Sequence, residues 1–492
     1  MKRLLVTVLT VLVYAVSVGA SQRRPNILFI VCDDLNTHVS TSGYEPIETP
    51  TFDMLARNGM TFSHAFCQYP VCGPSRASLL SGLYPESTGV LDNTADIRQT
   101  RPETLSMPQY FKQHGYWTAS VGKVFHNLKA DHGTVAWDDG GTWFTNDELP
   151  VVTIARETFE HEFGSVDQRE NRKAWREVMK AALDPLNAQT PPGHGPSGLQ
   201  DHQHKDGKNA RRVTGWLQEK PFGERPFFIA LGIQKPHVPF LAPEKYFQRY
   251  PRDQIVFHRD RPSLWDTIPS DAAASRYTAF GFKLGVEDEP RRREFMQAYH
   301  ACVSFIDAQL SLVFDELQTQ GFWDDTIIVL TSDHGYHLGD HFLWGKVTLF
   351  DIGAKVPFLV RVPGITRPGS RSNAMVELVD IFPTLSELAR LDVPSQAQGS
   401  SIVPILRDAD AEPTKSYAYS VVRRGPSLGY AVRNQYWRYG KWPHGEELYD
   451  LTTDPHERNN LAASAAHEPQ LAELRRVLTE KQQVASRRRL SD

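Results

Sequence analysis

Four apolar runs of strand length recur along the chain, and each of them ends in polar residues. The runs cover residues 26–32, 117–121, 227–231 and 326–330. Long connections separate them, and continuous apolar runs of this kind are typical of parallel strands that are buried on both faces. The pattern therefore predicts a mostly parallel sheet that is covered by helices on both sides.

Helical patterns lie between these runs. Residues 107–114, with Pro108 in the first turn, and residues 293–318 have amphipathic helical patterns. We expect both segments to cover the sheet. Residues 184–198 are rich in Pro and Gly and predict a mobile loop.

The end of the chain has a different pattern. Residues 430–433 and 436–439 are rich in aromatic side chains and predict a short antiparallel hairpin set, and residues 470–490 predict a closing helix. We therefore expect an α/β fold, with a mixed, mostly parallel sheet between helices and a smaller C-terminal α+β subdomain. The expected bounds are residues 24–415 for the large domain and 416–492 for the subdomain. A chain of 492 residues is longer than one hydrophobic core usually supports, which agrees with two units.

Composition narrows the classes of function. Apolar residues make up 40% of the chain and charged residues 23%, as in ordinary globular proteins, so the chain is not a disordered one. The formal net charge is −4, which gives no basic surface for nucleic acid. We expect no nucleic-acid partner.

The N-terminus has the pattern of an export signal. A basic start precedes an apolar stretch over residues 4–18, and residues 18–20 have the small-x-small form of a cleavage site. We expect residues 1–20 to be a signal peptide and the mature chain to begin near Ser21. The protein would then be secreted or periplasmic, or lysosomal in a eukaryote. An uncleaved anchor helix is the alternative, but the stretch is short for a bilayer span, so we expect no stable membrane span.

The cysteines do not form a disulfide framework. The chain has only Cys32, Cys67, Cys72 and Cys302, although an exported protein can form disulfides. Four cysteines are too few for such a framework in a chain of this length. At least one of them must therefore serve chemistry or packing.

Charged and polar side chains follow each predicted strand. Taken alone, such acids would be helix caps, the histidines hydrogen-bonded loop residues and the lysines solvated surface charges. The carboxyl ends of parallel strands meet at one edge, where ligands bind, so their joint placement predicts one charged crevice. The residues concerned are Asp33, Asp34, Lys123, His126, Lys235, His237, Asp333 and His334.

The most specific motif covers residues 72–82, CGPSRASLLSG. Pro74 suits the first turn of a helix, which places Cys72 at a helix N-terminus, where partial positive charge favours a thiolate or a bound sulfate. An isolated cysteine would more often be a buried apolar side chain. The motif resembles the signature of the type I, formylglycine-dependent sulfatases, Cys-x-Pro-Ser-Arg followed by Leu-x-Gly. Ser81 stands where that family often has Thr.

The resemblance extends over most of the chain. The segments that match occur in the family's order, and Gly-Lys-x-x-His, Lys-Pro-His-x-Pro and Asp-His-Gly are closer to the iduronate-2-sulfatase branch than to arylsulfatases. It implies an alkaline-phosphatase-like fold and hydrolysis of the sulfate esters of a sulfated carbohydrate. A glycosaminoglycan-like polysaccharide with a 2-O-sulfated uronic acid is the first choice. The matching segments are residues 24–34, 122–126, 235–239, 332–335 and 447–461.

The resemblance also implies two changes at the site. A formylglycine-generating enzyme would oxidise Cys72 to formylglycine during export, and the hydrated aldehyde would supply the attacking hydroxyl. Together with this residue, one divalent cation would be held by Asp33, Asp34, Asp333 and His334. Carboxylates are hard oxygen ligands, so we expect Ca²⁺.

The remaining roles follow the same resemblance. Arg76 would help to orient the hydrate, while Lys123, His237 and Lys346 would neutralise the sulfate oxygens. His237 or Lys346 would protonate the leaving alcohol. His126 would then take the proton of the second hydroxyl so that sulfate leaves.

Two other functions compete with this interpretation. The first is a phosphodiesterase or phosphonate hydrolase of the same superfamily, with His334, His337 and His341 as zinc ligands. Such an enzyme would normally have Thr or Ser as its nucleophile, so Cys72 argues against it. The second is a protein without activity that only binds sulfated glycans, which requires that Cys72 is never oxidised.

Overall fold

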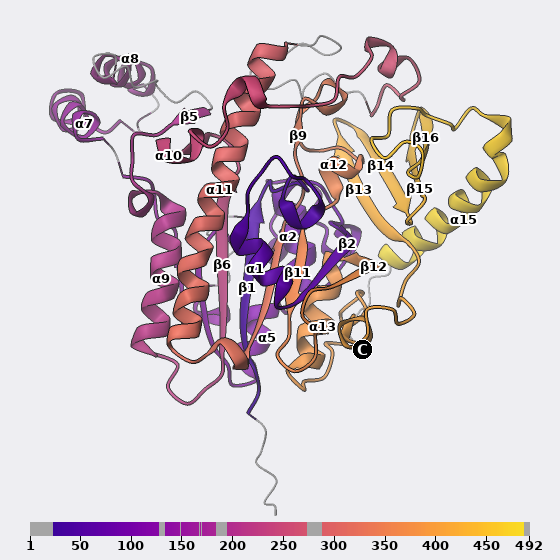
Figure 1. The fold of residues 1–492 in the computed structure, drawn as a ribbon, viewed down its shortest axis with the longest axis horizontal. Helices are drawn as coiled ribbons and strands as arrows, with labels where there is room; N and C mark the ends of the chain where they lie inside the picture. The colour runs from indigo at the N-terminus through magenta and orange to yellow at the C-terminus, as the bar shows by residue number, and fades with distance from the viewer. Residues whose placement is uncertain are drawn as a thin grey trace, which may run out of the picture.

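An eight-stranded sheet forms the centre of the computed structural model, which describes residues 23–126, 133–147, 149–166, 168, 170–183, 194–272 and 288–486 (Figure 1). The strand order is β12-β2-β11-β8-β1-β6-β3-β4. The strands are β1 (Asn26–Asp33), β2 (Met60–Phe66), β3 (Trp117–Gly122), β4 (Asp139–Thr142), β6 (Phe227–Pro236), β8 (Thr326–Ser332), β11 (Phe358–Arg361) and β12 (Ser370–Glu377).

The four predicted strands are neighbours in this sheet. β1 pairs in parallel with β6 and β8, and β6 pairs in parallel with β3. β11 runs antiparallel to both β8 and β2, so the sheet is mixed. The predicted α/β fold with a mixed, mostly parallel sheet is confirmed.

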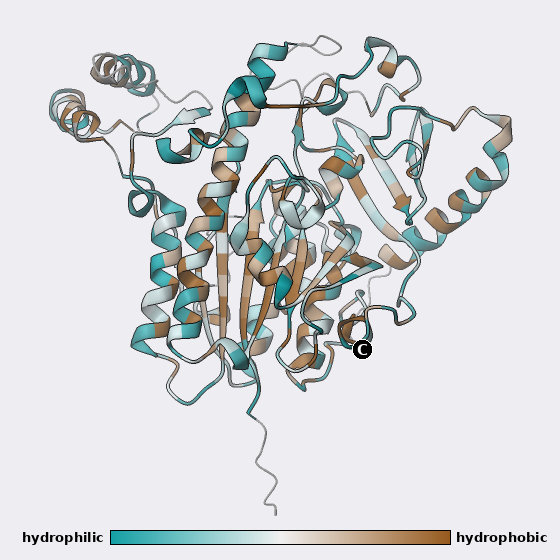
Figure 2. Ribbon diagram, viewed as in Figure 1, coloured by the Kyte–Doolittle hydropathy of each residue, from teal (hydrophilic) through white to brown (hydrophobic). Residues whose placement is uncertain are grey.

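Alternating side chains of β1 bury two separate cores. Ile27 and Phe29 pack with α2 (Cys72–Ser81), α5 (Met107–Gln113) and α13 (Ile381–Leu388). Leu28 and Ile30 pack on the opposite face with α1 (Pro50–Arg57), α9 (Lys205–Glu219) and α11 (Glu289–Thr319). Figure 2 shows the strands as hydrophobic bands between helices. Each such side chain contributes roughly 1.5–3 kcal/mol on burial.

The long helix α11 extends the helix predicted over residues 293–318. It starts at Glu289 because the side chain of Asp288 accepts a hydrogen bond from the backbone N–H of Arg291 and Pro290 occupies the first turn. α5 covers residues 107–113, as the pattern predicted.

A second, four-stranded antiparallel sheet lies beside the large one in Figure 1. Its strands are β13 (Ala418–Arg424), β14 (Ser427–Arg433), β15 (Trp437–Trp442) and β16 (Gly445–Asp450), and α15 (Glu468–Ala485) covers it. The closing helix was predicted over 470–490, but α15 ends at Ala485, and residues 487–490 lie outside the described part. The domain boundary between residues 415 and 416 stays a prediction.

Two helices stand away from the main body in Figure 1. α7 (Pro150–Phe163) and α8 (Arg172–Leu183) pack on each other through Phe159 and Trp175. The predicted mobile loop follows them. Its residues 184–193 lie outside the described part, but residues 194–196 form β5 (His194–Pro196) and pair in parallel with β7 (Phe240–Ala242), so that end of the prediction was wrong.

Short elements complete the chain. They are α3 (Pro85–Thr88), α4 (Ile97–Thr100), α6 (Gly133–Ala136), α10 (Glu244–Phe247), α12 (Asp351–Ala354), α14 (Val403–Arg407), β9 (His337–Leu338) and β10 (Trp344–Gly345). The predicted signal peptide lies outside the described residues. Among the helices of the described segments, none has the length and apolar character needed to cross a bilayer.

Candidate active site

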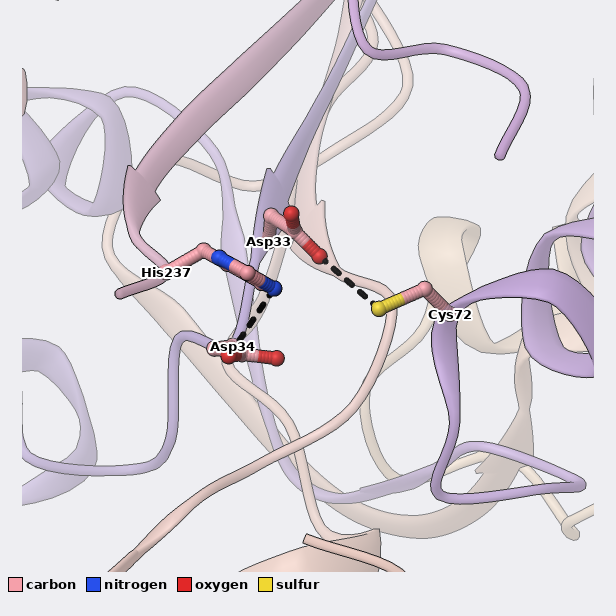
Figure 3. Close-up of side chains that lie close together, drawn as sticks. All are labelled: Asp33, Asp34, Cys72 and His237. Atoms are coloured by element: carbon pink, nitrogen blue, oxygen red, sulfur yellow. Dashed lines mark hydrogen bonds and ion pairs between the residues drawn. The ribbon is translucent and has the colours of Figure 1, made fainter. Parts of the chain in front are cut away.

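The polar residues that follow the strands meet at one edge of the large sheet. Asp33 ends β1 and Asp34 follows it, and their side chains lie beside those of His237 and Cys72 in Figure 3. Asp333 and His334 follow β8, and Lys123 follows β3. The charged groups expected to meet at the strand ends are therefore together for Asp33, Asp34, Lys123, His237, Asp333 and His334.

Cys72 is surrounded by charged groups. Its buried thiol lies 3.2 Å from Asp33 Oδ1, to which it donates, and 3.3 Å from His334 Nε2. Lys346 Nζ donates to the sulfur over 3.1 Å. An apolar packing role does not explain these neighbours, so Cys72 stands at the centre of the candidate site.

The helix that begins at Cys72 has few free amide groups to offer an anion. The N–H of Gly73 donates to Asn93 Oδ1 over 2.8 Å, the N–H of Ser75 donates to the carbonyl of Val71, and Pro74 has no N–H. Any anion held beside Cys72 therefore depends mainly on cationic side chains.

Acidic and imidazole groups form two overlapping sets around the thiol. Each set offers four ligand atoms within 4.8 Å of one another. Asp34 Oδ2 is buried and accepts no hydrogen bond from the described residues. A bare carboxylate oxygen in a buried position is costly, so this arrangement fits a cation. The sets are Asp33, Asp34, Cys72 and His237, and Asp33, Cys72, Asp333 and His334.

Cationic side chains balance these acids. Lys123 Nζ donates to Asp33 Oδ2 over 2.5 Å, and Lys346 Nζ donates to Asp34 Oδ1 over 2.6 Å. Burial alone would raise the pKa of Asp33, but Lys123 and its cationic neighbours hold that pKa well below its usual range. The charge of Asp34, followed by Cys72 and Asp33, raises the pKa of Lys346 well above its usual value against the opposing effect of burial. Both lysines are therefore charged at neutral pH.

Arg76 is buried and fully engaged. Its Nε donates to Asp333 Oδ2 over 2.8 Å, and its Nη1 donates to the carbonyls of Lys123 and Val124. Arg76 thus fixes one carboxylate of the cluster and the chain that follows β3.

The histidines of the site differ in charge. Burial would lower the pKa of His334, but Asp333 and Cys72 raise it to about 9. Burial and then Lys123 lower the pKa of His126 to about 4, and its buried Nδ1 has no hydrogen-bond partner among the described residues. His237 Nδ1 lies 2.6 Å from the carbonyl of Val238, and its Nε2 lies 3.9 Å from Asp34 Oδ2. His126 is therefore neutral and able to accept a proton at neutral pH.

Two histidines of the alternative zinc set have other roles. His337 Nε2 lies 2.7 Å from Thr348 Oγ1, and His341 Nε2 lies 3.1 Å from the carbonyl of Glu457 while its ring stacks on Phe350. Neither joins His334 in a ligand set among the described residues. The zinc set of His334, His337 and His341, which the rival phosphonate hydrolase function would use, is not formed, because two of the three rings hold the neighbouring loop.

Residues 25–391 match the sulfatase family. The chain belongs to this family. Residues 339–484 also match the family described as N-sulphoglucosamine sulphohydrolase, C-terminal. The resemblance found in the signature motif is therefore confirmed, and this sulfatase is a sulfuric ester hydrolase.

Relatives match this sulfatase over nearly their whole length. It is 31% identical to a sulfatase of Formosa agariphila over 473 residues, which covers 92% of this chain and 86% of that one. It is 29% identical to the iduronate 2-sulfatase of Mus musculus over 539 residues, covering 92% and 93% of the two chains. The solved phosphonate monoester hydrolase of Agrobacterium radiobacter has a TM-score of 0.75 at 22% identity and covers 94% of this chain and 96% of that one. This last likeness supports the alkaline-phosphatase-like fold.

Sequence patterns missed several residues that shape the site of this sulfatase. Asn93 caps the first turn of α2, and Ser75 Oγ donates to the carbonyl of Asp333. Asp206 accepts the N–H groups of Gln234 and Lys235 over 2.8 Å each. Ser75 lies inside the signature motif, which does not predict this contact, and neither Asn93 nor Asp206 belongs to an apolar period or to the tail of a strand. Lys235, which the strand pattern did select, donates to the carbonyls of His237 and Pro239 and supports that loop.

Proposed function

We propose that this protein is an exported sulfatase that removes sulfate esters from a sulfated carbohydrate. The observation that carries the proposal is the position of Cys72, whose sulfur contacts an acid, an imidazole and an ammonium group at once. A sulfate ester keeps a negative charge throughout hydrolysis, so its site needs fixed cations beside the nucleophile.

The nucleophile in this proposal is formylglycine, formed from Cys72 by a formylglycine-generating enzyme. Support comes from the Cys-x-Pro-Ser-Arg motif and from the match to the sulfatase family. Hydrated formylglycine supplies the attacking hydroxyl, and a bound cation supplies positive charge that favours its deprotonated form.

The cation is proposed to be Ca²⁺, held by Asp33, Asp34, Asp333 and His334. Support comes from the buried, unbonded Asp34 Oδ2 and from the preference of Ca²⁺ for carboxylate oxygen. Next to the acids and without a cation, His334 has a pKa of about 9 and is protonated at neutral pH. It would have to lose this proton to join the set, because a histidine binds a metal in its neutral form.

The chain's own cations and bases have separate tasks. Lys123 bonds Asp33 and Lys346 bonds Asp34, and both would neutralise the sulfate oxygens. Arg76 holds Asp333 in place. His237 or Lys346 would give a proton to the leaving alcohol, and the neutral His126 would accept one so that sulfate departs.

The first choice of substrate is a terminal 2-O-sulfated uronic acid of a glycosaminoglycan-like polysaccharide. Support comes from the relative named iduronate 2-sulfatase, which matches over 92% of this chain. A pocket with several cations also suits a sugar that carries both sulfate and carboxylate.

The test uses the exported protein, produced with and without the modifying enzyme. We expect its mass to report an aldehyde at residue 72 and its turnover to be highest on terminal 2-O-sulfated uronates, compared with neutral sulfated sugars and an aryl sulfate. Preference for a neutral sugar would reject the uronate but keep the sulfatase. An active protein with an unmodified thiol would reject formylglycine.

The same preparation separates the alternatives. Turnover of phosphonate monoesters above that of sulfate esters would favour the phosphonate hydrolase that its fold resembles. Binding of sulfated glycan without turnover of any ester would identify a catalytically silent module.

A further inference from the structure

The first turn of α9 lies against the strand ends that deliver the catalytic residues. Asp206 accepts the N–H groups of Gln234 and Lys235 at the end of β6. Asn209 contacts the end of β3, where a Cβ on Gly122 would lie 2.5 Å from Asn209 Nδ2. Lys205, the first residue of α9, precedes Asp206 and therefore starts the helix at the end of β6, the strand that leads to His237.

Lys205 differs from the other lysines at this edge because no hydrogen bond or ion pair joins its ammonium to a carboxylate of the described residues, although Asp206 and Asp33 act on it from a distance. Lys123 and Lys346 each donate to a carboxylate, and Lys235 donates to two carbonyls. In the described parts of the chain, the ammonium of Lys205 makes neither a hydrogen bond nor an ion pair, although the side chain is only partly exposed.

The electrostatic surroundings agree with this contrast. Burial, followed by the charge of Lys235, lowers the pKa of Lys205 to about 8, whereas carboxylates raise the pKa of Lys123 against burial. Asp206 and Asp33 oppose the shift of Lys205, and Lys123 adds to it. A partly buried cation without a counter-ion is stabilised by an anion from solution.

We infer that Lys205 is a specificity-determining residue that binds a second anionic group of the substrate, on the sugar that carries the scissile sulfate. This inference rests on the proposed sulfatase function and deepens it. The group is a carboxylate or a second sulfate, since either would pair with a partly exposed ammonium. Lys123 and Lys346 would remain the ligands of the ester that is cleaved.

One turn further along α9, Lys208 offers a matched control. Its Nζ donates to Asp147 Oδ1 over 2.5 Å and to the carbonyl of Thr145 over 2.9 Å. Lys208→Met therefore removes a lysine from the same helix that is already neutralised by the protein.

The test compares kcat/KM of the wild type, Lys205→Met, Lys205→Arg and Lys208→Met on three esters: a 2-O-sulfated uronate, a disulfated neutral sugar and an aryl sulfate. On substrates whose second anionic group Lys205 binds, we expect Lys205→Met to lower kcat/KM about tenfold, mainly by raising KM. On the aryl sulfate, kcat/KM should fall less than about twofold. Lys205→Arg should restore most of the loss, and Lys208→Met should behave as the wild type. Loss on the uronate alone identifies a carboxylate subsite, and loss on the disulfated sugar alone identifies a sulfate subsite.

Two results would overturn the inference while leaving the sulfatase intact. They are an equal loss on all three esters, which indicates a general defect of the site, and no loss on any of them. Wild-type protein that carries formylglycine but cleaves none of the esters would reject the proposed function and this inference together.

Discussion

A single oxygen atom gives the strongest residue-scale support for a bound cation. Asp34 Oδ2 is buried without a hydrogen bond, and the backbone of Asp34 has a φ of 67°. Residues other than Gly adopt this left-handed region at some cost, although Asp tolerates it better than most. The fold thus leaves one buried oxygen of this carboxylate without a donor among the described residues, and a bound cation would satisfy it.

Asp34→Asn should therefore remove the cation. The amide keeps the shape of the side chain but loses the charge and replaces one ligand oxygen by a donor. We expect metal content to fall from about one Ca²⁺ per chain to a small fraction, with turnover falling about 10²-fold or more. Elemental analysis of the purified protein measures the first effect.

The control for this variant is Asp139→Asn. Asp139 pairs with Arg212 and lies outside the metal cluster, so its amide variant should keep its metal. Unchanged calcium in Asp34→Asn would contradict the ligand assignment, and stoichiometric zinc in the wild type would contradict the choice of ion.

His126 predicts the acidic limb of the activity profile. Burial beside Lys123 lowers its pKa to about 4 in the folded protein, against about 6.5 in an unfolded chain. The base form therefore persists down to about pH 4, so kcat/KM should remain high at pH 5 and fall near pH 4. His126→Gln should lose about 10²–10⁴-fold in turnover.

The same shift has a consequence for stability. Between about pH 6.5 and pH 4 the unfolded chain binds more protons at His126 than the folded one does. This contribution is complete above pH 6.5 and is lost as pH falls through that window.

The activity profile also tests the role of His126. A plot of kcat/KM against pH whose acidic limb lies near 6.5 would exclude His126 as the base.

At the scale of elements, the loop that carries Lys346 is held by the small sheet. Arg433 of β14 donates to the carbonyl of Leu349 over 2.8 Å and pairs with Asp351. Glu457 accepts the N–H of Asp351 over 2.6 Å. Val347, next to Lys346, has a φ of 71°, which a β-branched residue rarely adopts, so these contacts hold a strained segment in place.

Arg433→Met should weaken catalysis without touching the substrate. Without its bonds to the small sheet, the loop would place Lys346 less accurately. We expect kcat/KM to fall about tenfold, which is less than the loss that a full misplacement of about 1 Å commonly causes. Arg423→Met, on the neighbouring strand, removes an exposed arginine and should have little effect. Equal kinetics of the two variants would show that the small sheet does not position the loop.

Elements with a strong apolar period were predictable, and those without one were not. β1, β3, β6 and β8 are continuous apolar runs, so their existence and common edge followed from the sequence. Three of the four residues of β11 are apolar too, but nothing in its pattern gives its antiparallel direction. α7 and α8 bury their apolar residues mainly against each other. The apolar pattern of helices that cover the sheet therefore does not reveal them.

The same distinction applies to the candidate site. Its strand-end acids and histidines, Lys123 and Lys235 could be named from their position after strands, and Cys72 from one motif. Lys346 could be named only through the family resemblance. Asn93 meets Gly73 only through the folding of a loop, and Lys205 stands at a helix start that no motif marks. Side chains recruited by tertiary contact leave no local signal in a sequence.

At the scale of the whole molecule, one buried lysine joins the two sheets. Lys415 Nζ donates to Glu377 Oε2 over 2.5 Å and to Asp380 Oδ1 over 2.7 Å, while Glu377 also accepts the N–H of Tyr419 in β13. Burial alone would raise the pKa of Glu377, but Lys415 and then Lys481 lower it to about 2. The junction between the sheets therefore contains a buried ionic group beside the apolar contacts of Phe66 and Met375 with Ala418.

Lys415→Met should destabilise the whole protein. Two buried carboxyl groups would lose their shared cation, which typically costs about 3–5 kcal/mol. The midpoint of urea unfolding should fall accordingly, compared with Lys441→Met, which removes an exposed lysine from β15. A midpoint that falls equally in both variants would show that the junction contributes nothing special.

The hydrogen bonds of His337 and His341 also limit how this enzyme could evolve. Each ring is bonded to the segment around Lys346 or to the chain beyond β16. If evolution recruited these two rings as ligands of a second cation, both hydrogen bonds would have to break. The loop that carries Lys346 would then be held less firmly. A variant on the way to new metal chemistry at this edge would therefore be less active than the present enzyme, and selection for sulfate hydrolysis would act against it.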